Sequence, residues 1–187
     1  MTVIRPTEQQ REHSSVAAFG RGALGLHVDG AGEPVPPPVI TLLVKHPSIS
    51  GGNTILVDAR EVLDRLAKKH ARTTAALQIR LQMRGQTFPL LDQSTPGDAR
   101  IIVRYRDDGA AQPLTTLDRE NLESFKQALH VLRHEIAFKT DEGYIVHNHR
   151  WLHGRTPFVG TREVHRLLGQ LSEQSDYQHL NRGFGWD

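Results

Sequence analysis

The chain has 187 residues, of which 37% are hydrophobic and 24% are charged, and its formal net charge is +2 with His counted as neutral. This length predicts one globular domain with a sizeable core. The small net charge argues against a nucleic-acid partner and against an anionic membrane surface. The absence of cysteine excludes disulfides, zinc–thiolate sites, iron–sulfur clusters and cysteine nucleophiles. Any bound metal must therefore be held by His, Asp, Glu or backbone oxygen.

The two ends of the chain are polar. Residues 1–20 predict a loose arm without the apolar core of a signal peptide, and residues 172–187 predict a loose tail. No stretch approaches the roughly 20 apolar residues that a membrane-spanning helix needs. We therefore expect a cytoplasmic protein with no membrane partner, folded as a single domain over residues 1–187.

In the first half of the chain, short β-branched runs at residues 39–44 and 53–57 predict two buried strands. Asp58 follows the second run and is the expected N-cap of a helix, because apolar residues recur after it at helical spacing. A further helical stretch is expected over residues 73–82.

Further along, residues 84–91 and 100–105 predict two strands joined by a turn at residues 94–97. Asp118 is the expected N-cap of the clearest helix in the chain. Its apolar face consists of Leu122, Phe125, Leu129 and Leu132.

The remaining strands are expected at residues 136–139, 144–147 and 162–168. The whole chain thus contains about eight short strands and two or three helices, without regular alternation of strand and helix. This pattern favours a mainly-β fold with flanking helices, such as a sandwich, a barrel or a jelly roll.

The segment His27-Val28-Asp29 is a candidate metal site. In an extended strand, residues i and i+2 project from the same face, so this His and this Asp can share one ion. A second His from a distant segment would complete a triad of two His and one carboxylate, which leaves coordination positions open and suits Fe(II). His153 can supply this ligand, and His147 and His149 compete with it. His149 and His153 would lie roughly 13 Å apart along a strand, so only one of them can complete the triad.

Two more segments add charged and small residues. Arg162, Val164 and Arg166 face the same way if residues 162–168 form a strand, and two inward guanidinium groups require an anion. A dicarboxylate fits this requirement, since Arg binds carboxylate through two parallel hydrogen bonds. The segment Gly51-Gly52-Asn53-Thr54 allows close backbone approach at the start of a strand and offers a hydroxyl group to a carboxylate.

Taken together and in this order, the four segments resemble the taurine dioxygenase and clavaminate-synthase-like family of Fe(II)/2-oxoglutarate-dependent oxygenases. The segment from Asn148 to Phe158, which contains His153, is especially similar to that family's distal-His segment. The resemblance implies a double-stranded β-helix (jelly-roll) core, with Fe(II) bound by His27, Asp29 and His153. It also implies that Arg162 and Thr54 bind the distal carboxylate of 2-oxoglutarate, and that Arg166 supports the co-substrate or meets an acidic group of the substrate.

The same resemblance implies a reaction in which 2-oxoglutarate and O2 are consumed, with succinate and CO2 as co-products. The expected outcome is hydroxylation of an unactivated C–H bond, with desaturation or cyclisation as alternatives. A small polar molecule, such as an amino acid or a derivative, is the expected substrate. Candidate pocket residues are Arg104, Arg106, Trp151 and Arg155.

The chain departs from the family pattern at Asn53 and His147, where the family usually has Asp. Only 26 residues precede His27, so we expect either a reduced version of the family or a site completed by a partner or a second subunit, as in a homo-oligomer. Two other readings stay open. One is a cupin-like metal-dependent dioxygenase or isomerase that does not use 2-oxoglutarate, and the other is a degenerate, non-enzymatic binding protein.

Overall fold

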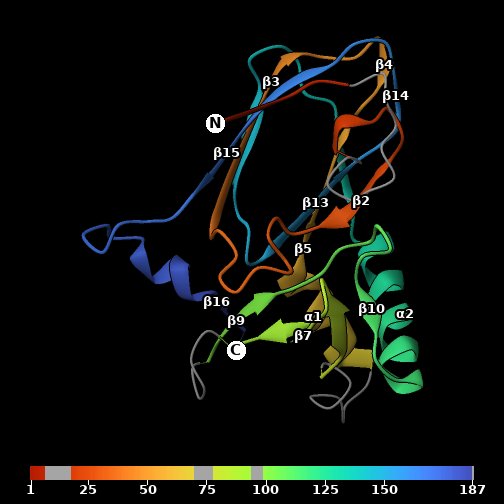
Figure 1. The fold of residues 1–187 in the computed structure, drawn as a ribbon, viewed down its shortest axis with the longest axis vertical. Coiled ribbons are helices and arrows are strands. Elements are labelled where there is room, and N and C mark those ends of the chain that lie inside the picture. The colour runs from red at the N-terminus through yellow and green to blue at the C-terminus, as the bar shows by residue number, and fades with distance from the viewer. Residues whose placement is uncertain (7–17, 70–77, 94–98, 187) are drawn as a thin grey trace.

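Two four-stranded antiparallel sheets build the part of the molecule drawn above the helices in Figure 1. The computed structural model describes residues 1–6, 18–69, 78–93 and 99–186. Sheet A has the strand order β1 (Thr2–Ile4), β15 (Glu163–Gly169), β3 (Val39–His46) and β12 (Gly143–His147). Sheet B has the order β11 (His134–Ile136), β5 (Thr54–Asp58), β13 (Trp151–Arg155) and β2 (Leu24–His27).

The two sheets face each other, and the space between them holds polar side chains from both. Arg166 of sheet A contacts Asp29, which follows β2 of sheet B. The ring of Tyr144 on β12 lies 6.3 Å from the ring of His153 on β13, measured between centroids. The expected mainly-β fold with a jelly-roll core and flanking helices is therefore confirmed.

The opposite, outer face of sheet A is partly apolar. Val3, Leu167 and Ile145 are exposed, with Ile145 at 72% of its full accessible surface. The sequence of β15 consequently lacks a clean alternation of apolar and polar residues, because Leu167 points outward while Arg166 points inward.

The main hydrophobic core lies at the other end of the molecule, where helices α1 (Ala59–Lys69) and α2 (Thr116–Val131) pack on small sheets. Leu63, Leu81 and Phe125 are fully buried there, and Tyr105 meets Phe125 edge to face at 5.3 Å. The small sheets there are formed by β10 (Gln112–Pro113), β6 (Arg80–Met83) and β7 (Gln86–Pro89), and by β16 (Phe184–Gly185), β9 (Arg100–Val103) and β8 (Leu91–Asp92). The pair β14 (Phe158–Val159) and β4 (Ser50–Gly51) lies at the opposite end of the molecule (Figure 1).

The two helices begin with different caps. Asp58 caps α1 as expected, since its carboxylate accepts a hydrogen bond from the backbone N–H of Arg60 at 3.0 Å. The N-cap of α2 is Thr115 and not Asp118, so that prediction was wrong by three residues. Asp118 occupies the third helical position, and its carboxylate accepts a hydrogen bond from the N–H of Thr115, which completes a capping box.

Residues 78–92 differ from the sequence prediction. The helix expected over residues 73–82 is wrong at residues 80–82, which belong to β6, while residues 73–77 and the turn expected at 94–97 lie outside the described part. Leu81 and Met83 are buried and alternate with exposed neighbours, so this segment has the two-residue period of a strand and not the period of a helix. The single strand expected at 84–91 begins two residues later than predicted, because Arg84 and Gly85 form a turn with positive φ between β6 and β7. It is also interrupted at Leu90, which separates β7 from β8.

The other expected strands agree with the structure to within two residues at each end, apart from one. The strand predicted at 136–139 runs instead from His134 to Ile136.

Both chain ends are tied to the body of the molecule where the structure describes them. Residues 2–4 form β1, at the edge of sheet A. The tail, expected to be loose from residue 172, instead contains the 3-10 helix η2 (Gln178–Arg182) and β16, which pairs with β9. Phe184 is buried, and the indole N–H of Trp186 donates to Asp64 at 2.8 Å. These two aromatic residues explain why so polar a tail is held in place.

His147 links the tail to sheet A and makes stability depend on pH. Its Nε2 atom donates to the carbonyl oxygen of Leu180 at 2.9 Å, and burial lowers the pKa of His147 to about 4. Because this pKa lies below the ordinary value of about 6.5, the unfolded chain binds the proton first as the pH falls. We therefore expect the free energy of unfolding to decrease between pH 6.5 and pH 4.

Urea denaturation at a series of pH values measures this effect. The decrease should be smaller in His147→Gln than in the original chain, since the variant lacks this titrating group. Equal slopes in the two proteins would contradict the assignment.

Candidate metal centre

The pairing of β2 with β13 brings His27 and His153 together. The two residues lie directly opposite each other in the antiparallel ladder, and their ring centroids are 4.4 Å apart. Asp29 follows two residues after His27, and the intervening Val28 donates its N–H to the carbonyl oxygen of Tyr105 at 3.0 Å. The carboxylate oxygens of Asp29 lie 3.7 Å from Nε2 of His27 and 3.8 Å from Nε2 of His153.

A β-bulge in β2 orients the ring of His27. Two residues of β2, Gly25 and Leu26, lie opposite the single residue Gly154 of β13. The carbonyl oxygen of Gly25 lies 2.9 Å from Nδ1 of His27. A proton on Nδ1 satisfies this hydrogen bond and leaves the lone pair of Nε2 directed toward Asp29. Glycine is required at the bulge, since a Cβ atom at position 154 would lie only 2.8 Å from the carbonyl oxygen of Leu24.

The protonation states within this triad suit a metal ion. Burial, reinforced by the charge of His27, lowers the pKa of His153 to about 3. Burial alone would raise the pKa of Asp29, but the interaction with His27 and the charge of Arg166 hold it well below its usual range. At neutral pH, His153 is therefore a neutral imidazole and Asp29 an ionised carboxylate, as a divalent metal requires of its ligands. The three ligand atoms lie within 4.8 Å of one another.

Asn148 fixes the backbone of Asp29. Its side-chain oxygen accepts from the N–H of Asp29 at 3.0 Å, and its side-chain nitrogen donates to the carbonyl oxygens of Asp29 at 2.9 Å and Pro37 at 2.8 Å. Asn148 is fully buried and precedes His153 by only five residues. One amide side chain thus joins the two segments that supply the metal ligands.

Arg166 fixes the carboxylate of Asp29. Its Nη1 atom lies 2.9 Å from one oxygen and 3.1 Å from the other. Arg166 therefore faces inward as predicted, but it contacts a metal-ligand candidate and not a separate anion.

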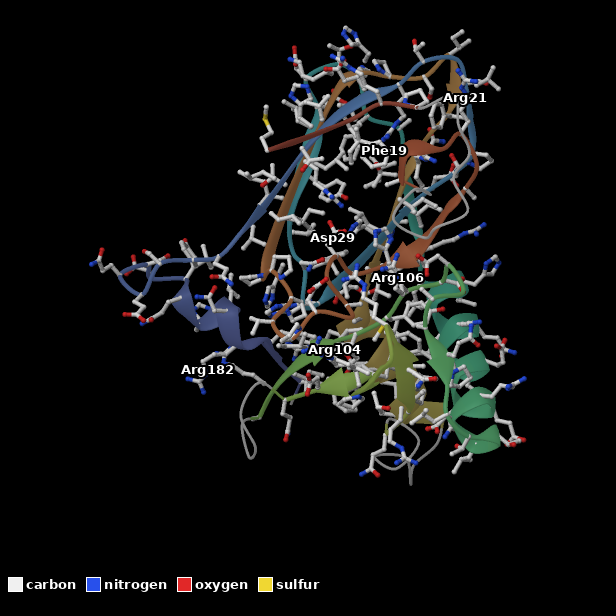
Figure 2. All side chains as sticks on the ribbon, in the orientation of Figure 1. Phe19, Arg21, Asp29, Arg104, Arg106 and Arg182 are labelled. Carbon is white, nitrogen blue, oxygen red and sulfur yellow. The ribbon has the colours of Figure 1, made fainter. Side chains whose placement is uncertain are left out.

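One cavity is lined by residues of the triad, and a second cavity lies close to it. One, of about 300 Å³, is lined by His27 and Asp29 together with Arg106 and Arg166. The other, of about 230 Å³, is lined by Thr54, Phe138 and Arg162. Figure 2 shows Asp29 and Arg106 in the middle of the molecule, between sheet A and the helices.

Arg162 is buried without an anionic partner. It is 7% exposed, and no hydrogen bond or ion pair joins it to another residue in the described part of the chain. Thr54 lines the same cavity and lies on the same face of β5 as Leu56, which is opposite His153 in the ladder. By general strand geometry, Thr54 and His153 are diagonal neighbours about 7–8 Å apart. The three predicted co-substrate residues therefore line two different cavities: Thr54 and Arg162 line one, and Arg166 lines the other.

The competing His residues lie elsewhere. His147 donates to Leu180, as described above, and Nε2 of His149 lies 2.9 Å from the carbonyl oxygen of Pro36. Neither residue belongs to the group formed by His27, Asp29 and His153.

Three of the four candidate pocket residues have structural contacts instead. Arg104 donates to the backbone carbonyls of Ala31, Glu33 and Pro34 and forms an ion pair with Asp92. Arg155 donates to the carbonyls of Gly20 and Gly22. Trp151 begins β13 opposite Asp58 and lines neither cavity beside the triad. Of the four, Arg106 lines a cavity beside the triad, and it is paired with Asp108.

The sequence analysis missed Tyr144 and gave Asn148 no role. Tyr144 faces the triad because β12 pairs with β3 and β3 pairs with β15, so that Tyr144, Leu42 and Arg166 share one row across sheet A. The alternation of residues along β12 was readable in the sequence, but the register that aligns this row was not.

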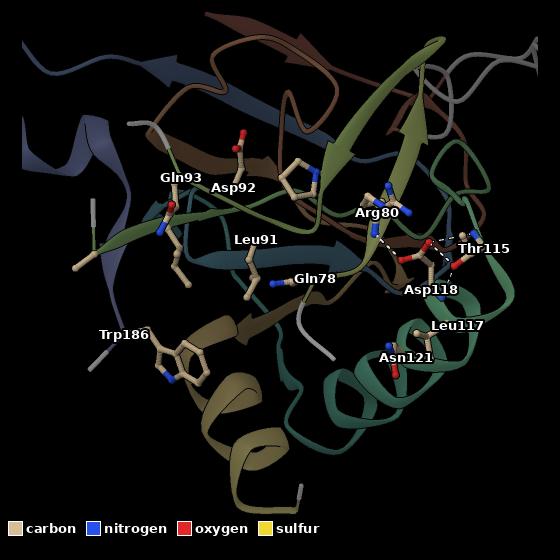
Figure 3. A pocket seen from close by; sticks show the side chains of 13 residues that line it. Gln78, Arg80, Leu91, Asp92, Gln93, Thr115, Leu117, Asp118, Asn121 and Trp186 are labelled. Carbon is tan, nitrogen blue, oxygen red and sulfur yellow. Dashed lines mark hydrogen bonds between the residues drawn. The ribbon is translucent and has the colours of Figure 1, made fainter. Parts of the chain in front are cut away.

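A larger cavity lies away from the triad. It measures about 920 Å³ and is bordered by α2, the strands β6 and β8, and Trp186 (Figure 3). Its carboxylates already have partners, since Asp118 belongs to the capping box and Asp92 pairs with Arg104. This cavity therefore offers no ready metal site among the residues that the structure describes.

The Asn148 contacts generate a prediction. In Asn148→Asp, the side chain keeps its shape but loses both donated hydrogen bonds and adds a buried charge. Because such supporting contacts orient metal ligands, we expect about 10–100-fold weaker Fe(II) binding, measured by anaerobic calorimetry.

Asn181→Asp is the matched control. Asn181 makes the same pair of hydrogen bonds to the backbone of Leu171, far from the triad, and its loss should leave Fe(II) binding unchanged. Fe(II) binding by Asn148→Asp that equals that of the original chain would refute the role.

Comparisons with solved structures show the same fold. The chain matches asparagine oxygenase in complex with Fe(II), 2S,3S-3-hydroxyasparagine and succinate with a TM-score of 0.72 and 21% identity, over 89% of this chain and 56% of that chain. It matches PvcB from Pseudomonas aeruginosa with a TM-score of 0.66 and 19% identity, over 90% of this chain and 64% of that chain. It matches the non-heme iron oxygenase OrfP, in complex with Fe and L-Arg, with a TM-score of 0.61 and 15% identity, over 98% of this chain and 62% of that chain.

This chain thus spans less than two thirds of the length of each of these proteins. No curated protein gives a significant match. In the described part of the chain, no helix combines the length and apolar character needed to cross a membrane. The family model "Taurine catabolism dioxygenase TauD, TfdA family" matches residues 2–168, which is well over half of the sequence. The chain therefore belongs to the TauD/TfdA family of dioxygenases.

Proposed function

We propose that this chain is an Fe(II)- and 2-oxoglutarate-dependent oxygenase that hydroxylates an unactivated C–H bond of an amino acid or an amino-acid derivative. The observation on which this proposal rests is the combination of the His27, Asp29 and His153 group with the buried, unpaired Arg162 in the adjoining cavity. A metal site alone would fit many enzymes, whereas a metal site beside a free buried cation fits a chelating anion.

The three metal-ligand candidates supply two imidazole nitrogens and one carboxylate. This set occupies one face of a metal ion and leaves adjacent positions for a bidentate co-substrate and for O2. When bound, Fe(II) would supply the activation of O2 that is coupled to decarboxylation of 2-oxoglutarate. The residues of the chain hold and orient the ion, with Asn148 and Arg166 fixing Asp29.

Arg162 and Thr54 are assigned to the distal carboxylate of 2-oxoglutarate. A buried guanidinium group without a partner is costly, and a carboxylate offsets this cost through two parallel hydrogen bonds. Burial lowers the pKa of Arg162, but an arginine remains charged at neutral pH and keeps its demand for an anion. OrfP has been crystallised with Fe and alpha-ketoglutaric acid, which supports this assignment by analogy.

The cavity that adjoins Asp29 is assigned to the substrate. Its rim carries side chains of both charges, among them the ion-paired Arg84 and Glu33, and its inner part contains Arg106 and Arg166. Neighbouring groups of opposite charge complement a zwitterion, as an amino acid is. The structures of asparagine oxygenase with 3-hydroxyasparagine and of OrfP with L-Arg support the choice of an amino acid.

Anaerobic titration of the Fe(II)-loaded protein with 2-oxoglutarate tests the proposal. Chelation of the 2-oxo acid by Fe(II) should produce a weak visible absorption band. His153→Ala should abolish the band because the metal loses a ligand. Arg162→Leu should still bind Fe(II), but its affinity for 2-oxoglutarate should be lower by at least about tenfold, since a hydrogen-bonded ion pair is lost.

His147→Gln serves as the control, because His147 lies outside the triad, and it should titrate like the original chain. If Fe(II) binds but no band develops, 2-oxoglutarate is not the co-substrate. If the band develops, formation of succinate with a panel of amino acids identifies the substrate.

A further inference from the structure

Tyr144 lies between the two parts of the site. Its ring centroid is 6.2 Å from that of Phe138 and 6.3 Å from that of His153. Phe138 lines the cavity that contains Arg162 and Thr54, while His153 belongs to the metal-ligand group. The aromatic ring of Tyr144 is thus adjacent both to a residue that lines the Arg162 cavity and to a residue of the triad.

Burial and three charged residues influence the hydroxyl group of Tyr144. Burial raises the pKa of Tyr144 and the charge of Asp29 raises it further, while Arg162 and Arg166 act in the opposite direction. The net effect is a strong rise, so the phenol is protonated at neutral pH and can donate a hydrogen bond. No hydrogen bond joins this hydroxyl group to another residue in the described part of the chain.

The position of Arg162 leads to the same place. Arg162 and Phe138 line one cavity, and the ring of Tyr144 lies against that of Phe138. The Tyr144 side chain is therefore next to the cavity that contains the Arg162 guanidinium group. A guanidinium group and a neutral hydroxyl donor beside one cavity form a binding site for a carboxylate, because both carboxylate oxygens can accept hydrogen bonds.

We propose that Tyr144 binds 2-oxoglutarate, with its Oη atom donating to the distal carboxylate beside Arg162 and its ring lying next to His153 of the triad. This inference rests on the proposed function, because it assigns a further residue to the same co-substrate. It also explains why an aromatic residue with a hydroxyl group, and not an aliphatic one, occupies the inward-facing row of sheet A that contains Leu42 and Arg166.

The test compares Tyr144→Phe with the original chain in the anaerobic titration. The variant keeps the ring and loses only the hydroxyl group, so Fe(II) binding should be unchanged. Loss of a hydrogen bond to a charged carboxylate should weaken 2-oxoglutarate binding by about 10–100-fold. Tyr177→Phe is the matched control, since Tyr177 is exposed and distant from the site, and it should have no effect.

A second probe locates the contact on the co-substrate. 2-Oxobutyrate keeps the chelating 2-oxo acid group but has no distal carboxylate, so Tyr144→Phe and the original chain should bind it equally well. If Tyr144→Phe weakened the binding of 2-oxobutyrate and of 2-oxoglutarate equally, the substitution would disturb the site in general, and the proposed hydrogen bond would be overturned.

The remaining outcomes are also decisive. If Tyr144→Phe binds 2-oxoglutarate as tightly as the original chain, the role of Tyr144 is refuted while the proposed function stands. If the original chain binds Fe(II) but never binds 2-oxoglutarate, the proposed function falls and this inference falls with it. Thermal melting of Tyr144→Phe verifies that it is folded, and Tyr144→Trp, which keeps an aromatic wall but lacks the hydroxyl, should reproduce the loss of 2-oxoglutarate binding.

Discussion

The antiparallel pairing of β2 with β13 is the constraint on which the site depends. It places His27 directly opposite His153, although 125 residues separate them in the sequence. Residues that face each other across a ladder have side chains within contact distance, so the register alone creates the histidine pair. The bulge at Gly25 and Leu26 then turns one backbone carbonyl toward the ring of His27. Metal-ligand geometry is therefore a product of backbone hydrogen bonding more than of side-chain packing.

The second contribution comes from the way in which sheet A closes over sheet B. Arg166 and Tyr144 reach the triad from the opposite sheet, and Asn148 joins the end of β12 to Asp29. Each of these polar groups is at least partly buried, and burial is costly for a polar group without a partner. Arg162 is a buried cation without an anionic partner in the described part of the chain, so its chemistry points most directly to a bound anion.

Much of this could be predicted from the sequence, because some of the information is local. The i, i+2 spacing of His27 and Asp29, the capping of α1 by Asp58 and the strand character of residues 39–44 depend on near neighbours alone. The hairpin at Arg84 and the ordered tail could not be predicted, since a positive φ at a non-glycine residue and the anchoring of Trp186 on Asp64 depend on distant contacts. The division of Arg162 and Arg166 between two cavities was hidden for the same reason. Both point inward, but the partner of each is set by the opposite sheet.

The mixed character of β15 has a consequence for how the protein folds. A strand with apolar residues on both faces, such as Val164 inside and Leu167 outside, gains little from one alignment over a shift by one residue. Specific polar contacts, above all that of Arg166 with Asp29, must then select the native alignment. The residues that orient the metal ligands would thereby also select the native strand alignment during folding. A variant that lacks these polar contacts is expected to populate slowly interconverting conformers with misaligned strands, even though its amino-acid composition and its core are almost unchanged.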